Sequence, residues 1–185
     1  EGVGYFRVNQ RSGWRMNTAK AFLRTATGEN LKVETGAHTR RILIENGRAV
    51  GVEYSQGGAV KTARTGGEVL LSAGAINSPQ TLMLSGIGPA AQLKANGVDV
   101  AVDLPGVGQG LQDHLAVSHV FWANTATLND RLGSFAGQMK AGLQYMLTRK
   151  GPLSVPVNQC SGFVRTKGAA LPDVQVYCNP ASYST

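Results

Sequence analysis

The residues best suited to contact a ligand lie between positions 74 and 88, which read GAINSPQTLMLSGIG. The small side chains of Ala73 and Gly74 leave room for a flat ligand to approach the backbone. Ser78 is predicted to be the N-cap of a helix and Pro79 its first residue, so the free amide groups of that helix would face the ligand. A helix start of this kind favours negative charge.

The elements that must position these residues are a strand before them and a helix through them. Residues 68–74, EVLLSAG, form an apolar run that predicts a strand buried on both faces of an α/β sheet. Ligands of open α/β sheets bind beyond the carboxyl ends of the strands. The helix is predicted to bury Leu82, Met83 and Leu84 and to end near Gly86. An ordinary strand, turn and helix without a ligand remains the alternative.

A second motif, PGVGQGLQDH, occupies residues 105–114. Together with the first motif, in this order and at this spacing, it resembles the signatures of the glucose-methanol-choline (GMC) oxidoreductases. Weaker similarities to that family, such as GWRMNTAKAFL at residues 13–23, cover almost the whole chain. The resemblance implies a flavoprotein that oxidises the CH–OH group of an alcohol with bound FAD, passing a hydride to flavin N5.

The residues predicted to bind the cofactor follow from the resemblance and from their position at the helix start. They are Thr39, Ala73, Gly74, Asn77, Ser78, Asp113 and His114. Thr39 falls where the family presents backbone groups to the adenine end of FAD, a place commonly held by Val. Gly110 replaces the Asn that is usual in the second motif, which removes an amide able to order that loop.

Two parts of the family pattern are missing from the sequence. The amino-terminal Gly-x-Gly-x-x-Gly that holds the pyrophosphate is absent, and so is the carboxyl-terminal His region that supplies the catalytic base. The chain is therefore expected to be a central fragment that contains no catalytic residue, with His114 in a structural role. The alternatives are a non-catalytic flavin-fold binding module and a lyase on the same flavoprotein scaffold.

The predicted fold class is α/β (α+β). By resemblance, residues 1–120 are segments of an FAD-binding Rossmann-like domain with a β-hairpin region at 30–65. Residues 121–185 are the start of an antiparallel-sheet substrate domain. The boundary is expected between residues 115 and 127, where the composition changes.

Local signals predict the individual elements. The dipeptide Asn46-Gly47 predicts a hairpin between strands at 39–45 and 49–54. The tripeptide Gln56-Gly57-Gly58 predicts a second hairpin. Further predicted strands and helices are strands at 31–35, 116–123 and 174–178, and helices at 18–23 with Thr18 as cap, at 90–96 ended by Gly97, and at 135–150 stopped by Gly151-Pro152.

The composition of the chain limits the kinds of partner that the protein is expected to bind. The 185 residues carry a net charge of +7, of which +6 lies in residues 1–65. Because these basic residues are not interleaved with stacking aromatic side chains, we predict no nucleic-acid partner. No apolar stretch is long enough to span a bilayer, so we expect a soluble protein, with the cytoplasm favoured. The expected partner is a small-molecule alcohol, on the choline-dehydrogenase-like branch; which alcohol and which electron acceptor stay open.

Metal and disulfide chemistry are not expected. His38, His114 and His119 have no Cys or carboxylate neighbours at the spacing of a zinc site. Cys160 and Cys178 lie in apolar sequence and are predicted to be buried free thiols.

Overall fold

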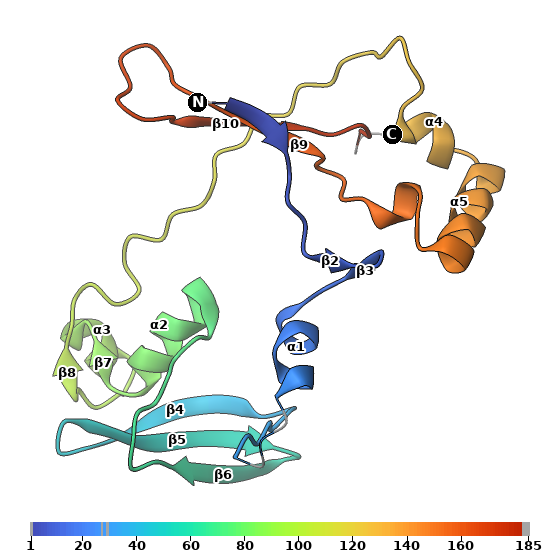
Figure 1. Ribbon diagram of the computed structural model, residues 1–185. Coiled ribbons are helices and arrows are strands. Elements are labelled where there is room, and N and C mark those ends of the chain that lie inside the picture. Colours follow the sequence, from blue (N-terminus) through green and yellow to red (C-terminus); the bar gives the residue numbers. More distant parts are fainter. Residues whose placement is uncertain (1, 27, 29, 183–185) are drawn as a thin grey trace. The chain divides into compact units, whose positions relative to one another are not determined.

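The structure is a computed structural model that describes residues 2–26, 28 and 30–182. Its contacts divide the chain into two compact units, one made of Glu1–Glu29 with Val117–Thr185 and one of Asn30–Ala116 (Figure 1). The sequence placed residues 1–120 in one domain, whereas residues 1–29 cluster with the carboxyl-terminal part. The assignment of segments to cofactor and substrate domains stays a prediction.

Unit Asn30–Ala116 contains a three-stranded antiparallel sheet. Its strands are β4 (His38–Glu45), β5 (Arg48–Gln56) and β6 (Ala59–Arg64), in the order β4-β5-β6. The Asn46-Gly47 turn has φ angles of 51° and 75°. Positive φ at both central residues matches the twist of a two-residue hairpin, so the sequence signal is physically explained. Both predicted hairpins are confirmed.

Helices of the same unit follow the sheet. They are α2 (Gly74–Leu84) and α3 (Ala90–Ala95), with the short parallel strands β7 (Ile87–Gly88) and β8 (Val102–Asp103) between and after them. Gly86 and Gly97, with φ of 81° and 70°, follow the two helix ends in left-handed conformation. The predicted ends of both helices are confirmed, and the mixed α/β (α+β) fold class is confirmed as well.

The start of α2 differs from the prediction. The helix begins at Gly74, so Pro79 lies inside it, and Ala73 occupies the N-cap position. Ser78 is not the N-cap; its hydroxyl instead accepts a hydrogen bond of 3.1 Å from the Ala73 N–H. Because Pro79 has no N–H, the Ala75 carbonyl one turn earlier receives no hydrogen bond from it.

The buried face of α2 also differs from the prediction. Thr81 is the buried residue of the helix, at 7% exposure, whereas Leu84 is 49% exposed. The Thr81 hydroxyl is satisfied by donating 2.8 Å to the Asn77 carbonyl. Burial of a threonine inside a helix is tolerated when its hydroxyl bonds to the preceding turn in this way.

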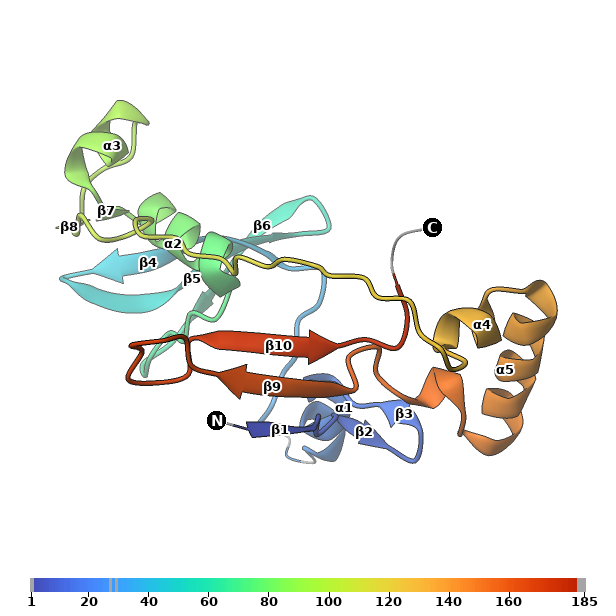
Figure 2. The same ribbon diagram turned by 90° about the horizontal axis from the view of Figure 1, so that it is seen from above.

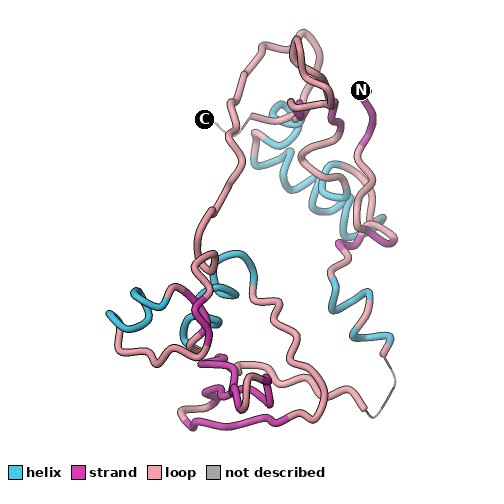
Figure 3. Tube along the Cα trace, turned by 90° about the vertical axis from the view of Figure 1, so that its left-hand side faces the viewer, coloured by secondary structure: helices cyan, strands magenta, loops and turns pink. Residues whose placement is uncertain are grey.

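Three predicted strands are wrong, namely those at 31–35, 68–74 and 116–123, which have no strand conformation. Leu70, in the middle of one of them, is 85% exposed. A strand requires a neighbour with which to exchange backbone hydrogen bonds, and no other segment among the described residues pairs with these three. Figure 3 draws the run between β8 and α4 (Leu128–Leu132) as loop.

The other unit contains the antiparallel sheet β1-β9-β10, with β1 at Gly2–Tyr5, β9 at Cys160–Val164 and β10 at Val174–Cys178. Figure 2 shows β9 and β10 side by side, joined by a loop. The strand predicted at 174–178 is confirmed. The remaining elements of this unit are β2 (Gln10–Arg11), β3 (Trp14–Arg15), α1 (Thr18–Ala21), η1 (Leu23–Thr25), α4, α5 (Phe135–Thr148) and η2 (Pro152–Ser154).

The helix caps of this unit are local. Asn17, not Thr18, is the N-cap of α1, because its side chain accepts a hydrogen bond of 2.9 Å from the Lys20 N–H. Ser134 caps α5 in the same manner through the Gly137 N–H. The predicted helix before Gly151-Pro152 is confirmed as α5.

The enclosed core of the described residues is small. Its buried hydrophobic side chains are Ile42, Leu93 and Ala141. The prediction of two buried thiols is wrong, because Cys178 is exposed and Cys160 is only half-buried. Cys178 is the last residue of β10, which is an edge strand of its sheet.

Candidate cofactor-binding site

The start of α2 is an open surface of small residues. Ala73 and Gly74 are exposed, and no side chain caps the helix or places an acidic group in its first turn. Gly74 has a φ of 88°, and a Cβ built on it would meet nothing within 4 Å. Glycine is favoured here by the backbone conformation, and the space in front of it is free. An uncapped helix start of this kind suits a ligand with negative charge.

Four of the seven predicted residues are brought together at this surface. Asn77 and Ser78 lie in the first turns of α2, directly after Ala73 and Gly74. Asn77 is exposed, whereas Ser78 is half-buried and its hydroxyl accepts the hydrogen bond from the Ala73 N–H. The Ser78 side chain therefore shapes the turn that enters the helix.

The second motif approaches α2 through the short parallel pair β7–β8. Gly88 is the register partner of Asp103, and the Leu104 N–H donates to the Gly88 carbonyl at 3.0 Å. The Asp103 carboxylate accepts 2.9 Å from the Ala90 N–H at the start of α3. These bonds align the chain entering residues 105–108 with the chain leaving α2.

Gly108 lies against α2. A Cβ built on it would come within 3.3 Å of the Met83 methyl group, and its φ is 77°. Close packing and positive φ together favour glycine at this position. The two sequence motifs are therefore in contact at Gly108 and Met83, about the middle of each.

Asp113 and His114 follow that contact in a segment without regular structure, and both are exposed. The Asp113 carboxylate accepts a hydrogen bond of 2.7 Å from the His114 N–H. The described residues place no second acid or base against the His114 ring. Among those residues His114 therefore has no partner for acid–base chemistry.

Thr39 lies at a second place, on β4. It is the register partner of Tyr54 and helps to line a shallow hollow of about 190 Å³. The hollow is lined by Glu34, Ala37, Thr39, Val52, Tyr54 and Ala63. Ligand pockets are typically about 300–1,000 Å³, so this hollow is smaller than a complete ligand pocket.

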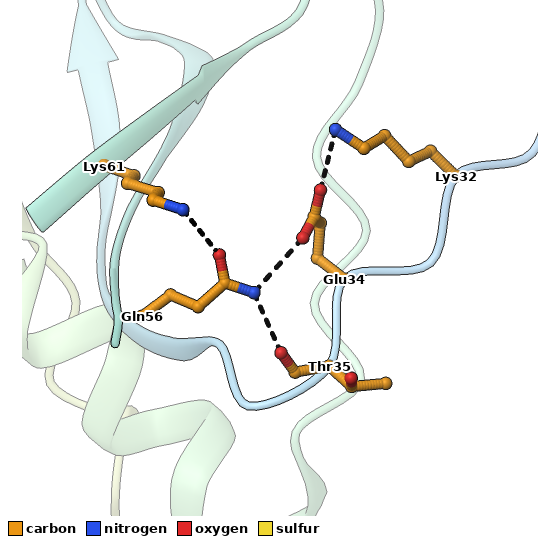
Figure 4. Close-up of polar contacts among 5 residues, drawn as sticks. All are labelled: Lys32, Glu34, Thr35, Gln56 and Lys61. Carbon is orange, nitrogen blue, oxygen red and sulfur yellow. Dashed lines mark hydrogen bonds and ion pairs between the residues drawn. The ribbon is translucent and has the colours of Figure 1, made fainter. Parts of the chain in front are cut away.

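A polar network fixes the segment that enters this hollow (Figure 4). The Gln56 amide donates to the Glu34 carboxylate at 3.1 Å and to the Thr35 carbonyl at 2.9 Å. Its amide oxygen accepts 2.8 Å from the Lys61 ammonium, while Lys32 pairs with Glu34 at 2.7 Å. One glutamine therefore fastens the residues before Thr39 to the end of the β5–β6 hairpin.

The network shifts the ionisation of its charged members. Hydrogen bonds from Lys32 and Gln56 lower the pKa of the Glu34 carboxyl, and the Lys32 charge lowers it further. The hydrogen bond to Glu34 raises the pKa of Lys32. Both charged forms are favoured by the contact.

Thr39 was predicted from the sequence to contact the cofactor, which stays a prediction, whereas the residues around it were not predicted. Val52 and Tyr54 lie on the same face of β5, because residues two apart in a strand point to the same side. This period of two is the signal in the sequence that could have indicated them. Gln56 carried no signal, because its partners come from a segment that has no regular structure. A larger hollow of about 260 Å³, between β1 and β9, contains none of the predicted residues.

The chain thus combines the β4-β5-β6 sheet with the helix α2, whose open start favours an anion and on which the second motif packs. The model of the GMC oxidoreductase family matches residues 1–116, so the chain belongs to that family. The recognition made from the two motifs is confirmed.

Curated proteins that are similar in sequence to this chain are named as alcohol or choline dehydrogenases. The chain is 43% identical over 170 residues to an alcohol dehydrogenase [acceptor] of Pseudomonas putida, covering 90% of this chain and 31% of the relative. It is 40% identical over 185 residues to an oxygen-dependent choline dehydrogenase of Photobacterium profundum, covering 98% and 32%. The chain thus spans about a third of the length of the curated relatives it matches.

Solved structures share the fold. Pyridoxine 4-oxidase from Mesorbium loti matches with a TM-score of 0.75 and 27% identity, over 97% of this chain and 32% of that one. A formate oxidase variant from Aspergillus oryzae matches with a TM-score of 0.71 and 28% identity, over 84% and 27%. These matches confirm the predicted fold class.

The described residues contain neither a candidate metal site nor a candidate membrane-spanning helix. Residues 2–26, 28 and 30–182 contain no group of three His, Cys, Asp or Glu side chains that could hold a metal ion. Within the same ranges, no helix is both long and apolar enough to cross a membrane.

Proposed function

We propose that this chain builds part of the FAD site of an enzyme that oxidises the CH–OH group of a small alcohol. The observation that carries the proposal is the open start of α2, where Gly74 has free space before it and no acidic residue lies in the first turn. Membership of the GMC oxidoreductase family supports FAD as the ligand.

The residues of the chain have different tasks in this proposal. Ala73 and Gly74 leave space for the flavin, and Asn77 and Ser78 belong to the turns that present the helix start. Asp113 and His114 border the flavin, at the end of the motif that packs on α2 through Gly108. Thr39 contacts the adenine end of FAD with its backbone, at the hollow beside Tyr54.

FAD, when bound, accepts a hydride from the alcohol carbon. The residues described above supply orientation, since hydride transfer requires the two reactants to be held in a fixed geometry. None of them is assigned the role of the base that removes the hydroxyl proton. The substrate is proposed to be a small alcohol such as choline, by analogy with the names of the relatives.

The test uses the full-length protein that carries this chain. We expect it to be purified with bound FAD and to reduce a dye, or oxygen, with choline or a simple primary alcohol as the electron donor. A folded protein that retains no flavin would contradict the proposal and would favour a non-catalytic binding module. Bound flavin without alcohol oxidation would instead favour a lyase on this scaffold.

The site itself is tested by Ala73→Leu. Ala73 has a φ of −89°, so leucine is accommodated by the backbone and only fills the exposed space. We expect a lower FAD content per protein, read from visible absorbance, before any change in thermal stability. Ala95→Leu, at an exposed position of α3, is the matched control and should retain FAD. Full flavin content with lost activity in Ala73→Leu would contradict the assignment.

A further inference from the structure

Two cysteines lie opposite each other on the neighbouring strands β9 and β10. Cys178, the last residue of β10, is the register partner of Cys160, the first residue of β9. Both are free, with Cys160 half-buried and Cys178 exposed. The pair lies at the open end of the β9–β10 hairpin, opposite to its connecting loop (Figure 2).

The register brings the two thiols within bonding reach. Directly opposite residues of antiparallel strands have Cα atoms about 4.5 or about 5.5 Å apart, according to their hydrogen-bond pattern. Disulfides join Cα atoms about 4.4–6.8 Å apart. Either arrangement of Cys160 and Cys178 therefore permits a disulfide without movement of the backbone. Register partners also share one face of the sheet, so the two side chains leave it on the same side.

The surroundings differ for the two sulfurs. Cys160 lies in the central strand, where its other register partner is Tyr5. Partial burial raises the pKa of the Cys160 thiol, and the hydrogen bond and charge of Cys178 raise it further. Cys160 is therefore protonated at neutral pH. Cys178, at the exposed edge strand, is the sulfur that a reagent in solution reaches first.

A metal is a weaker explanation of the pair. The described part of the chain brings no third His, Cys, Asp or Glu side chain to it, so a metal ion would have only two protein ligands. A structural zinc site requires about four. Two facing thiols without further ligands are instead suited to oxidation.

We propose that Cys160 and Cys178 are a modification site, a dithiol that hydrogen peroxide oxidises to an intrachain disulfide. The Cys178 sulfur attacks one peroxide oxygen, the O–O bond breaks, and the departing oxygen leaves as water with the thiol proton. The Cys160 sulfur then attacks the sulfenic sulfur, and the S–O bond breaks as a second water leaves. Two thiols lose two hydrogen atoms, and one peroxide becomes two waters.

Peptide mapping of the full-length protein tests the proposal. Trypsin cleaves after Arg165 and Lys167, which separate the two cysteines, so a disulfide appears as one linked pair of peptides. After treatment of the reduced protein with hydrogen peroxide, we expect this linked pair and the loss of both thiols, reversed by dithiothreitol. Recovery of both cysteines as separately alkylated peptides after peroxide would overturn the proposal. This wild-type measurement depends on no variant and on no bound flavin.

Variants separate the two roles. In Cys160→Ser the reaction is expected to stop at a sulfenic acid on Cys178, which dimedone traps. In Cys178→Ser the remaining thiol is expected to react with peroxide more slowly than Cys178 does in Cys160→Ser. Equal rates for the two single variants would contradict the assignment of Cys178 as the first sulfur to react.

A register control addresses the geometry. The double variant Val176→Cys with Cys178→Ser keeps two thiols on the same face, but places the new one opposite Gly162 instead of Cys160. Diagonal neighbours in a sheet are about 7–8 Å apart, beyond the reach of a relaxed disulfide. We expect no linked peptide at the peroxide dose that oxidises the wild type. Linkage as complete as in the wild type would show that the register does not determine the reaction.

Discussion

The Ser85 hydroxyl accepts a hydrogen bond of 2.8 Å from the Ile42 N–H and donates one of 2.6 Å to the Thr81 carbonyl. This single side chain joins the C-terminal end of α2 to the middle of β4. Ile42 is one of the few buried hydrophobic residues of its unit. The helix whose start carries Gly74 is therefore held to the sheet that carries Thr39.

Ser85→Ala is expected to lower the free energy of unfolding by about 1–3 kcal/mol, because it leaves the partly buried Ile42 N–H without a partner. The measurement is urea denaturation. Ser72→Ala is the control, since the exposed Ser72 side chain makes no hydrogen bond among the described residues. Equal losses of stability in the two variants would mean that the bond between α2 and β4 contributes nothing.

Glu34 provides a prediction of pH dependence. Because its pKa is lowered in the folded state, its contribution to stability is complete above about pH 4.3, the ordinary value of a Glu side chain, and is lost as the pH falls through the folded value. Lys32 has a raised pKa in the folded state. Its contribution to stability is therefore complete below about pH 10.4, the ordinary value of a Lys side chain, and is lost as the pH rises through the higher folded value.

Glu34→Gln should therefore have a lower melting temperature than the wild type at pH 7, and the difference should shrink at pH 3. Melting curves by circular dichroism at the two pH values give the comparison. Glu68→Gln is the matched control, because the exposed Glu68 makes no ion pair among the described residues. A difference between wild type and Glu34→Gln that is the same at both pH values would contradict the role of the Glu34 charge.

Elements with purely local causes could be predicted from the sequence. The Asn46-Gly47 turn requires positive φ at both residues, and few dipeptides supply it. Gly97 ends α3 for a similar reason, since glycine adopts the left-handed conformation after a helix without strain. In both cases the residue itself determines the conformation of its own backbone.

Elements that depend on a distant partner could not be predicted. Residues 68–74 have the composition of a buried strand, yet the described residues provide no neighbouring strand for them, and Leu70 is exposed. The hollow at Thr39 was missed in the same way, because Gln56 positions its entrance through contacts with an irregular segment. Composition indicates which segments are apolar, whereas the pairing of strands depends on residues far along the chain.

Gly47→Ala tests the backbone argument at the hairpin. A Cβ at Gly47 would meet nothing within 4 Å, so any loss of stability reports backbone strain at a φ of 75°. The left-handed conformation is disfavoured for alanine by about 1–2 kcal/mol, and we expect a loss of that size in urea denaturation. Gly66→Ala is the control, because Gly66 has equal space and no positive φ; it should be neutral or slightly stabilising. Similar losses at both positions would refute the strain explanation.

Arg149, the C-cap of α5, combines a strained backbone with an aromatic contact. Its φ is 56°, and its guanidinium carbon lies 4.1 Å from the centre of the Trp14 ring and 5.2 Å from that of Tyr145. The Tyr145 hydroxyl in turn donates 2.8 Å to the Gly13 carbonyl. The cation–π contacts therefore help to stabilise Arg149 in the left-handed backbone conformation, which is otherwise unfavourable for a residue other than glycine.

Two substitutions of Arg149 separate these effects. Arg149→Ala keeps the left-handed strain and loses both cation–π contacts, each worth about 0.5–1 kcal/mol, so its stability should fall. Arg149→Gly loses the same contacts but also relieves about 1–2 kcal/mol of strain, so its stability should lie above that of Arg149→Ala and close to that of the wild type. Urea denaturation measures both, and the emission of Trp14 should change in each variant because the cation leaves its ring. If alanine and glycine destabilise equally, the strain at Arg149 is absent and the aromatic contact alone explains its position.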